Sequence, residues 1–357
     1  MRILYIITCL GPGGAQVQVC NLADEMASLG HEVKIISLRN EISILPKNNI
    51  EVIPLGLEKN ITTLFSSLLK LKRYINIYKP NVIHSHMIHA NLLTRGLRLI
   101  TKMNFLINTA HSSNEGGRGM MNLYRVSDSL CDLMTNVSQE AVEIYIRKKA
   151  SASSKIICMY NGVDTNYFHK QKHLNINKEF NLSNDKKVIL SIGRLTEAKD
   201  YPNLINAFNL LNDKNVYLFI VGVGELEVEI KRMANKSILK DNILFLGERN
   251  DIPQLLSFCD VFVLSSKWEG FGLVVAEALS CECNVVATDC GGVKEVLSSY
   301  GYLIEKKNSR ELSKAIKSSL SVPKGLNIRG REYVVNKFDL KTIAKKWSDI
   351  YKEEQKR

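Results

Sequence analysis

Two glutamates in the stretch SSKWEGFGLVVAEALS (265–280) stand where a carboxylate needs a partner. Glu269 is followed by Gly270, and Glu277 lies eight positions later in a run of small and apolar residues. A carboxylate accepts two hydrogen bonds, which suits the vicinal hydroxyl groups of a ribose or a hexose. The helix predicted to begin near Gly272 offers free N–H groups and a positive dipole end, which suit a phosphate. The stretch therefore predicts a site for hydroxyl, phosphate and hydroxyl groups in series.

Two alternatives for these glutamates lead away from a ligand of that kind. The paired carboxyls of a glycoside hydrolase lie roughly 5 to 9.5 Å apart, whereas eight residues of continuous helix span about 12 Å. The spacing therefore disfavours hydrolysis. The other alternative makes Glu269 a solvated loop residue and Glu277 an ordinary helix glutamate, and the segment taken alone leaves it open.

The segment SIGRLTEAKD (191–200) supplies cations that could neutralise such a phosphate. Arg194 follows a glycine at the end of a predicted strand, and Lys199 comes five residues later. Arginine offers a planar fork of donors and lysine a compact charge, a combination suited to a diphosphate. Separate surface cations are the alternative in a chain with 48 lysines and arginines. Their position beyond a buried strand favours ligand binding.

A glycine loop, LGPGGAQ (10–16), follows the first predicted strand. Gly13 and Gly14 allow the backbone to approach a phosphate or a sugar closely. The loop departs from the dinucleotide-binding fingerprint, because Gln16 replaces the third glycine and Arg39 replaces the acidic residue after the second strand. These departures disfavour an NAD-dependent dehydrogenase.

Histidines cluster near two other strand ends of the first half. His111 follows FLINTA, and His84, His86 and His89 lie in HSHMIHA. No neighbouring carboxylate or cysteine completes a metal site, so we expect one or two of these histidines to line an acceptor side and the rest to be structural. The chain contains no Asp-x-Asp motif. We therefore expect neither a metal nor another cofactor, with the cations neutralising the diphosphate instead.

The elements that must position these residues alternate between strands and helices, which predicts an α/β protein with parallel sheets. The first series of predicted strands covers 2–8, 32–38, 82–86, 105–111 and 133–138, and the second covers 186–193, 216–222, 242–247, 260–266, 284–289 and 301–305. Each series opens with a buried strand, a glycine loop and a helix. This weak duplication predicts two Rossmann-like domains in tandem.

The predicted boundaries follow from composition. A first domain covers 1–165, a polar linker covers 166–187, a second domain covers 188–335 and a terminal helix covers 336–357. The terminal helix has one apolar face, formed by Leu340, Ile343, Ala344, Trp347 and Tyr351. Ligands of such proteins bind where the carboxyl ends of the strands face a crevice, so we expect the site between the two sheets.

Composition excludes several other classes. The 357 residues are 45% hydrophobic and 24% charged, which is typical of a globular protein. No apolar run reaches the roughly 18 residues of a membrane span, and a helix and a second strand follow the apolar start at once, which disfavours a signal peptide. The eight cysteines are scattered, which predicts a reducing, cytoplasmic location. The net charge of +12 suits phosphorylated or anionic partners, but no nucleic-acid-binding signature accompanies it.

A basic amphipathic segment lies at 62–79. It combines the apolar residues Leu64, Leu68, Leu71 and Ile75 with four lysines and arginines. One interpretation is a helix that lies on the inner face of the cytoplasmic membrane, in contact with anionic lipid. The other is a packed surface helix whose lysines reach solvent. The sequence leaves both open.

Taken together, the motifs resemble the family-4 retaining glycosyltransferases of the GT-B fold, also described as glycosyl transferases group 1. The resemblance rests on GPGGAQ, NGVDTNYF, GRLTEAKDYPNLINAF, LFIVGVGE, LGERNDIPQLL, EGFGLVVAEAL and VVATDCGGVKEVL, in that order along nearly the whole chain. It implies two Rossmann-like domains that face a central cleft. It also implies that the C-terminal helix crosses back to the first domain.

The resemblance implies a role for each candidate residue. Arg194 and Lys199 would bind the donor diphosphate, Glu277 the ribose hydroxyls and Glu269 the transferred sugar. The other implied contacts are His111 near the reacting centre, Gly13 and Gly14 over the phosphates, Arg249 and Ile252 beside the base, and the backbone at Gly270, Phe271, Gly272 and Leu273. The chain departs from the family pattern at Gln16, where glutamate is usual, at GVGE, and at Asn284, where proline is common.

The implied reaction is the metal-independent transfer of a hexosyl or N-acetylhexosaminyl unit from a nucleotide-diphosphate sugar, with UDP preferred, to a hydroxyl of a glycan or lipid-linked acceptor. Front-face displacement with retained configuration, in bacterial surface polysaccharide synthesis (O-antigen, lipopolysaccharide or capsule), is the corresponding expectation. The alternatives are a nucleotide-sugar epimerase or a phosphorylase of the same fold, and a protein that binds sugar nucleotides without catalysis.

Overall fold

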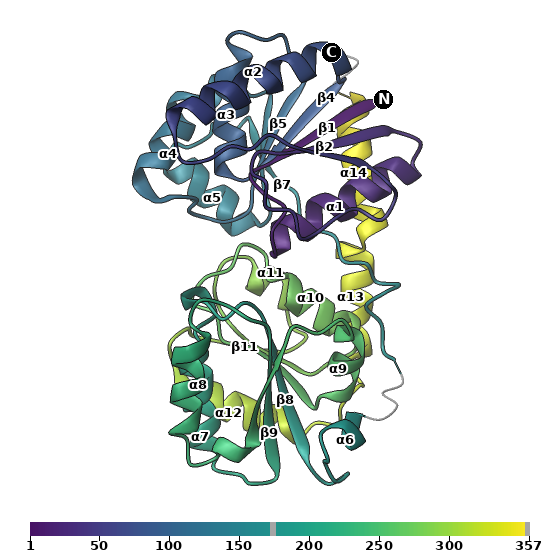
Figure 1. The fold of residues 1–357 in the computed structure, drawn as a ribbon. Helices are drawn as coiled ribbons and strands as arrows, with labels where there is room; N and C mark the ends of the chain where they lie inside the picture. Colours follow the sequence, from purple (N-terminus) through teal and green to yellow (C-terminus); the bar gives the residue numbers. More distant parts are fainter. Residues whose placement is uncertain (172–175, 354–357) are drawn as a thin grey trace. The chain divides into compact units, whose positions relative to one another are not determined.

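The computed structural model describes residues 1–171 and 176–353, and the chain forms two compact units (Figure 1). The first unit comprises Met1–Gly162 together with Leu340–Arg357, and the second comprises Val163–Asp339. Residues 172–175 of the predicted linker and 354–357 of the predicted terminal helix lie outside the described residues.

The first unit alternates strands and helices along the chain. Its elements are β1 (Arg2–Ile7), α1 (Gly14–Ser28), β2 (Glu32–Ser37), β3 (Glu51–Pro54), α2 (Ile61–Tyr78), β4 (Val82–His86), α3 (Ile88–Arg98), β5 (Leu106–Ala110), α4 (Gly117–Val126), the 3-10 turn η1 (Asp128–Leu130), β6 (Leu133–Asn136), α5 (Gln139–Arg147), β7 (Ile156–Cys158) and, at the far end of the sequence, α14 (Leu340–Glu353).

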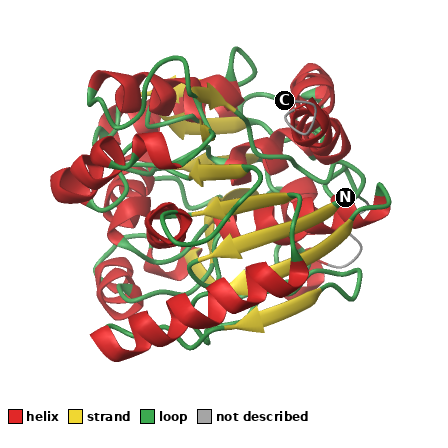
Figure 2. Cartoon of the chain, turned by 90° about the horizontal axis from the view of Figure 1, so that it is seen from above, coloured by secondary structure: helices red, strands yellow, loops and turns green. Residues whose placement is uncertain are grey.

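A seven-stranded parallel sheet forms the centre of this unit, in the order β3-β2-β1-β4-β5-β6-β7. The residues of its central strands β4 and β5 are buried on both faces, as a sheet covered by helices on both sides requires. One face packs against α2, α3, α4 and α5, and the other packs against α1 and α14. The strands run side by side in one direction (Figure 2).

The second unit repeats this plan. Its elements are α6 (Ile176–Glu179), β8 (Lys187–Ile192), η2 (Glu197–Lys199), α7 (Tyr201–Leu211), β9 (Val216–Val221), α8 (Glu227–Asn235), η3 (Lys240–Asn242), β10 (Ile243–Gly247), α9 (Ile252–Phe258), β11 (Val261–Leu264), α10 (Leu273–Ser280), β12 (Val285–Thr288), α11 (Val293–Leu297), β13 (Tyr302–Ile304), α12 (Ser309–Leu320) and α13 (Ile328–Phe338). The six parallel strands have the order β10-β9-β8-β11-β12-β13. Helices α7, α8 and α12 supply the core on one face of the sheet.

The described part of the stretch that we predicted as a linker is anchored in the second unit. The Gln171 N–H donates to Ser257 Oγ at 2.9 Å, and the Phe168 carbonyl accepts a hydrogen bond from Arg331 Nη1 at 3.1 Å. The polar composition predicted a linker, and within the described residues its side chains and backbone bind neighbouring elements. The chain crosses between the units at residues 162–163 and again at 339–340.

The end of the chain forms two helices where the sequence predicted one. The backbone of Asp339, with φ −56° and ψ 134°, interrupts the helical path between α13 and α14. All five residues of the predicted apolar face of α14 are buried, and four of them, Ile343, Ala344, Trp347 and Tyr351, join the core beside α1. The terminal helix therefore returns to the first unit, as predicted.

Candidate functional site

The order of strands in the second unit identifies where a ligand would bind. The chain fills the sheet from β8 outward to β10, and then returns to place β11 on the other side of β8. Ligands of open parallel sheets bind beyond the carboxyl ends of the strands at such a switch point. The loop after β8 carries Arg194 and Lys199, and the loop after β11 carries Glu269. The structure thus brings these predicted residues to one edge of one sheet.

Lys199 and Glu269 form an ion pair at this switch point. Lys199 Nζ lies 2.5 Å from Glu269 Oε1, and the exposed fractions of the two side chains are 20% and 14%. Ser266 Oγ donates to the same carboxylate oxygen at 2.7 Å. An ion pair with so little exposure is screened weakly by solvent. Glu269 is therefore held in place by Lys199 and Ser266 and is not a solvated loop glutamate.

Arg194 is exposed on the same loop. No ion pair or hydrogen bond engages its guanidinium within residues 1–171 and 176–353. The loop itself is fixed from below, because the Leu195 N–H donates to the Val223 carbonyl at 2.9 Å and the Tyr201 hydroxyl donates to the Gly193 carbonyl at 2.8 Å. The fixed backbone thus leaves the Arg194 guanidinium, with its five N–H donors, available for a ligand.

Glu277 lies one turn into α10 and is partly buried, between the buried residues Ala276 and Ala278. Loss of hydration raises the pKa of its carboxyl to about 7, and the positive charge of Lys199 acts in the opposite direction. The carboxyl is therefore close to half protonated at neutral pH. A group whose ionisation is poised in this way, beside a cation at a strand end, is a candidate for ligand binding.

Close backbone packing shapes the loop that carries Glu269. Gly291 has φ +58°, and a Cβ at this position would lie 2.0 Å from the Glu269 carbonyl oxygen. Next to it, the Gly292 N–H donates to the Gly270 carbonyl at 3.1 Å. The segment after β12 therefore supports the Glu269 loop, and only glycine fits at the point of contact.

The segment predicted to flank a base lies after β10. Arg249 pairs with Asp251 at 2.7 Å and with Glu179 at 2.7 Å, and these hydrogen-bonded carboxylates raise its pKa. Ile252 begins α9. The Arg249 guanidinium is thus occupied by the two carboxylates and holds its loop in place. A ligand at this segment would therefore contact the backbone.

Two residues near this edge were not singled out from the sequence. The Tyr167 hydroxyl donates to the Asn250 carbonyl at 3.0 Å, and its pKa is raised first by loss of hydration and then by the negative charges of Asp251 and Glu277. Ser266 binds Glu269, as described above. A serine at the carboxyl end of a buried strand is a usable signal, whereas the position of Tyr167 depends on long-range packing.

The first unit has its own switch point, between β1 and β4. Gly13 precedes α1, and Gly14 is exposed at its first position. A Cβ on Gly14 would meet no atom within 4 Å. Gln16 is buried, and its Nε2 contacts Cys9 Sγ and Met87 Sδ at 3.8 Å each. The glycine loop therefore lies at the edge where ligands of such sheets bind, while Gln16 points inward.

Three of the four histidines of the first unit's cluster lie together. His86 Nδ1 is 3.1 Å from His111 Nε2. His84 bonds Tyr351 Oη at 2.7 Å and Thr109 Oγ1 at 2.6 Å, and burial lowers its pKa strongly. His84 is thus structural, while His111 is partly exposed at the end of β5. His89 is exposed on α3 and takes no part.

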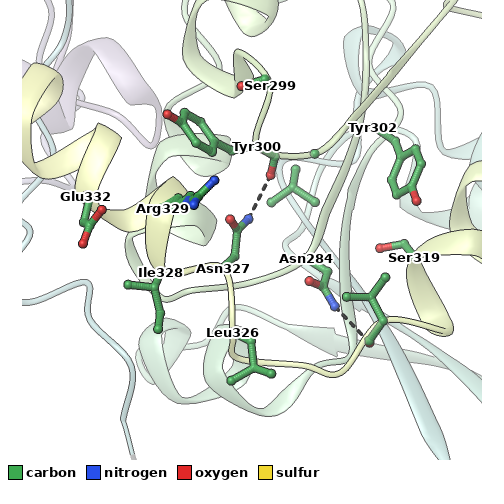
Figure 3. Close-up of a pocket in the computed structure, with 13 residues that line it drawn as sticks. Asn284, Ser299, Tyr300, Tyr302, Ser319, Leu326, Asn327, Ile328, Arg329 and Glu332 are labelled. Atoms are coloured by element: carbon green, nitrogen blue, oxygen red, sulfur yellow. Dashed lines mark hydrogen bonds between the residues drawn. The ribbon is translucent and has the colours of Figure 1, made fainter.

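A cavity of about 810 Å³ lies elsewhere in the second unit (Figure 3). It is lined by Asn284, Tyr300, Tyr302, Leu326, Arg329 and neighbouring residues. Asn284 and Gly301 immediately precede β12 and β13, so the cavity is at the amino ends of these strands. None of the predicted site residues lines it.

The described parts of the chain contain no group of three histidine, cysteine or acidic side chains arranged to hold a metal ion. None of the helices described is long and apolar enough to cross a membrane.

Comparisons with known proteins agree with this architecture. Residues 12–167 match the model of Glycosyltransferase Family 4, and residues 173–332 match the model of Glycosyl transferases group 1. The N-acetyl-alpha-D-glucosaminyl L-malate synthase of Bacillus anthracis is 24% identical over 98% of this chain and 97% of its own. The UDP-Gal:alpha-D-GlcNAc-diphosphoundecaprenol alpha-1,3-galactosyltransferase of Escherichia coli is 26% identical over 80% of this chain and 78% of its own. The structure of Anabaena HepE with UDP-glucose superposes with a TM-score of 0.86, at 20% identity, over 99% of this chain and 100% of that protein.

Proposed function

Because the chain belongs to the family-4 glycosyltransferases of the GT-B fold and is a hexosyltransferase, we propose that it moves a hexosyl or N-acetylhexosaminyl unit from a UDP-sugar to a hydroxyl of a glycan or lipid-linked acceptor. The observation that carries the proposal is the arrangement at one switch point of the Lys199–Glu269 pair and the available guanidinium of Arg194. Cations of these two kinds are suited to bind a diphosphate, and a carboxylate is suited to accept hydrogen bonds from a sugar hydroxyl.

Lys199 can serve the diphosphate without leaving Glu269. Its ammonium has three N–H donors, of which the ion pair with Glu269 needs one. A second donor is then free for a phosphate oxygen. In this arrangement Lys199 connects the diphosphate to the carboxylate that binds the transferred sugar, which fixes the sugar relative to its leaving group.

In the proposed reaction, the bond between the anomeric carbon and the diphosphate oxygen breaks while the acceptor oxygen bonds to the same face of that carbon. The acceptor proton passes to an oxygen of the departing diphosphate, so no metal ion and no enzyme nucleophile is required. Negative charge grows on the diphosphate, and Arg194 and Lys199 stabilise it. His111 contacts the sugar near the reacting carbon, and the backbone of Gly13 and Gly14 approaches the phosphates.

Glu277 is proposed to bind the ribose hydroxyls. Ionised, it accepts a hydrogen bond from each hydroxyl, and protonated it accepts fewer. Because its pKa is about 7 in the unliganded protein, part of the free energy of donor binding is used to keep the carboxyl ionised. The base would lie beside Arg249 and Ile252.

The acceptor class is proposed from the activity of a relative. The Escherichia coli relative acts on a sugar attached to diphosphoundecaprenol, and a similar lipid-linked acceptor in surface polysaccharide synthesis (O-antigen or capsule) suits a basic chain of charge +12. We propose that the protein works at the cytoplasmic face of the membrane. Anionic lipid would attract it there.

Helix α2 supports this proposal through a different face from the one expected. Leu71 and Ile75 are buried in the core of the first unit, in agreement with the alternative of a packed surface helix for this face. Ile61, Phe65 and Leu69 instead form an exposed stripe at spacing i, i+4, i+8, with exposed fractions of 69%, 61% and 66%. The helix therefore has two apolar faces, of which the core covers the one that contains Leu71 and Ile75.

The experiment that tests the proposed function combines a thermal-shift screen with an acceptor-free assay. We expect UDP-sugars to raise the melting temperature more than GDP- or ADP-sugars do. Without an acceptor we expect slow donor hydrolysis that releases UDP. Interconversion of the sugar nucleotide would establish an epimerase instead, and binding without any release of UDP would establish a non-catalytic binding protein.

A further inference from the structure

The contact between His86 and His111, near the first switch point, also determines where the ring protons lie. His86 is the last residue of β4, and His111 follows β5. The two strands pair in parallel with His86 opposite Thr109, which brings the rings within 5.4 Å of each other. His86 Nδ1 and His111 Nε2 are 3.1 Å apart, so one nitrogen donates a proton and the other accepts it.

The surroundings of His86 leave its second nitrogen alone. The residue is 2% exposed, and its ring lies 4.1 Å from that of His84 and 5.7 Å from that of Tyr5. Among the residues that the structure describes, His86 Nε2 has no hydrogen-bond partner, and solvent does not reach it. Burial lowers the pKa of His86 strongly, and it lowers that of His111 to about 4. Both rings are therefore neutral near pH 7, with one proton each.

These facts select one of two arrangements of the two protons. If His111 Nε2 donated to His86 Nδ1, the proton of His86 would lie on Nε2, where it would be a buried donor without an acceptor. If His86 Nδ1 donates to His111 Nε2, His86 Nε2 carries no proton and is only an acceptor without a partner. Orphaned buried N–H groups are rarer in proteins than under-satisfied acceptors. The second arrangement is therefore favoured.

We propose that His86 is a positioning residue that fixes the proton of His111 on Nδ1. Nδ1 of His111 makes no hydrogen bond to the described residues, and the side chain is partly exposed. His111 accordingly acts as a neutral N–H donor toward its ligand, and the group that it contacts is an oxygen acceptor. This use of the donor rests on the proposed function, whereas the assignment of the tautomer does not.

A second contact holds His111 from its backbone side. Its N–H donates to Glu115 Oε1 at 2.8 Å, and Glu115 Oε2 accepts a hydrogen bond from the Tyr124 hydroxyl at 3.0 Å. The main chain of His111 is thus held independently of His86. Substitution of His86 should therefore allow the ring proton of His111 to move between Nδ1 and Nε2. It should not displace the backbone of His111.

The first test is nitrogen NMR of the unliganded protein with labelled histidine at pH 7. His111 is identified by comparison with a His111→Gln variant. We expect its Nδ1 to show the shift of a protonated ring nitrogen and its Nε2 that of an acceptor. His86→Asn retains an amide N–H close to the position of Nδ1 and should preserve this pattern. His86→Leu has no donor, so His111 should exchange between both tautomers.

The second test is steady-state kinetics of the same two variants. His86→Leu should lower kcat about tenfold, the effect of losing one oriented hydrogen bond, with a smaller change in the KM for donor. His86→Asn should stay within about threefold of the wild type, and melting temperatures establish that both variants fold.

A proton on Nε2 of wild-type His111 would overturn the proposal. Equal losses of kcat in the folded His86→Leu and His86→Asn variants would also overturn it. If the NMR pattern is as expected but no transfer reaction is found, the tautomer assignment stands and the proposed function fails.

Discussion

Lys199 Nζ lies 2.5 Å from Glu269 Oε1, although the two residues are 70 positions apart. They come from loops that follow β8 and β11, neighbours at the switch point of the second sheet. The pair is nearly buried, and Ser266 holds the same oxygen. A cation and an anion that are fixed together at a strand edge can bind a diphosphate and the sugar attached to it.

Replacement of Lys199 by alanine should affect the chemical step most. We expect kcat at saturating donor to fall by about 10² to 10³, because one preorganised donor to the growing charge is lost. Lys231→Ala is the matched control. Lys231 lies on α8, and its ion pair with Glu227 of the same helix is solvent-exposed, so its loss should change kcat by less than about threefold. Near-normal turnover of the Lys199 variant would refute its assignment.

Replacement of Arg194 by alanine should weaken UDP binding without lowering stability. The guanidinium is exposed and has no partner within the described residues, so the fold does not depend on it. We expect the Kd for UDP to rise about tenfold, as for the loss of a charge-assisted hydrogen bond, with an unchanged melting temperature. Titration calorimetry measures the first quantity. Arg310→Ala, at an exposed position on α12, should leave both unchanged, and equal behaviour of the two variants would exclude the role.

Glu277 should make the protein less stable as the pH rises. Its folded pKa is about 7, above the ordinary value of 4.5. Between these values the native state binds more protons than the unfolded state, so the free energy of unfolding falls with rising pH. Glu277→Gln removes the charge that must be desolvated.

We therefore expect the Glu277→Gln variant to melt at a higher temperature than the wild type near pH 8 and at a similar temperature near pH 4.5. The same variant should bind UDP more weakly at pH 8. Thermal denaturation across this pH range measures the first effect. A constant difference in melting temperature at every pH would contradict the assigned pKa.

Gly291→Ala should disturb the site through the backbone. The added Cβ would lie 2.0 Å from the Glu269 carbonyl, and the positive φ of 58° is itself unfavourable for alanine. We expect kcat/KM to fall at least about tenfold as the Glu269 loop shifts. Gly119→Ala, where no atom lies within 4 Å of the new Cβ, provides the control. Full activity of a folded Gly291 variant would show that the loop position is not critical.

Helix α2 should bind anionic vesicles through its exposed stripe. A double variant, Phe65→Ser with Leu69→Ser, should lose most of its co-sedimentation with vesicles that contain phosphatidylglycerol, because burial of two large apolar side chains is lost. Ile238→Ser, at a position of the second unit that is 73% exposed, should leave sedimentation unchanged. Binding that does not depend on anionic lipid or on the stripe would exclude this surface.

The sequence predicted the strands that build the interior of both sheets, because most of them contain an apolar run, such as RILYII in β1, KVILSI in β8 and VYLFIV in β9. It missed β3 (Glu51–Pro54) and β7 (Ile156–Cys158), which are the two edge strands of the first sheet. Edge strands are short and half exposed, so their composition differs little from that of loops. The parallel architecture was nevertheless predictable from the central strands, whereas the return of the terminal helix was implied by the family resemblance.

The grouping of the candidate residues was predictable where they lie at strand ends. Arg194, Lys199 and Glu269 follow buried strands, and parallel strands bring their carboxyl ends to one edge. The contact of His86 with His111 depends on the register of β4 and β5, and the two apolar faces of α2 cannot be ranked without knowing which one the core covers. Such relationships are set by packing between distant segments, which periodicity does not encode.

The most direct test of the central claim is a crystal structure of the protein with UDP. We predict that the diphosphate contacts the Arg194 guanidinium and the Lys199 ammonium, with the ribose hydroxyls at Glu277. A diphosphate bound away from these residues, for example beside Arg329 in the cavity at the amino ends of β12 and β13, would contradict the account.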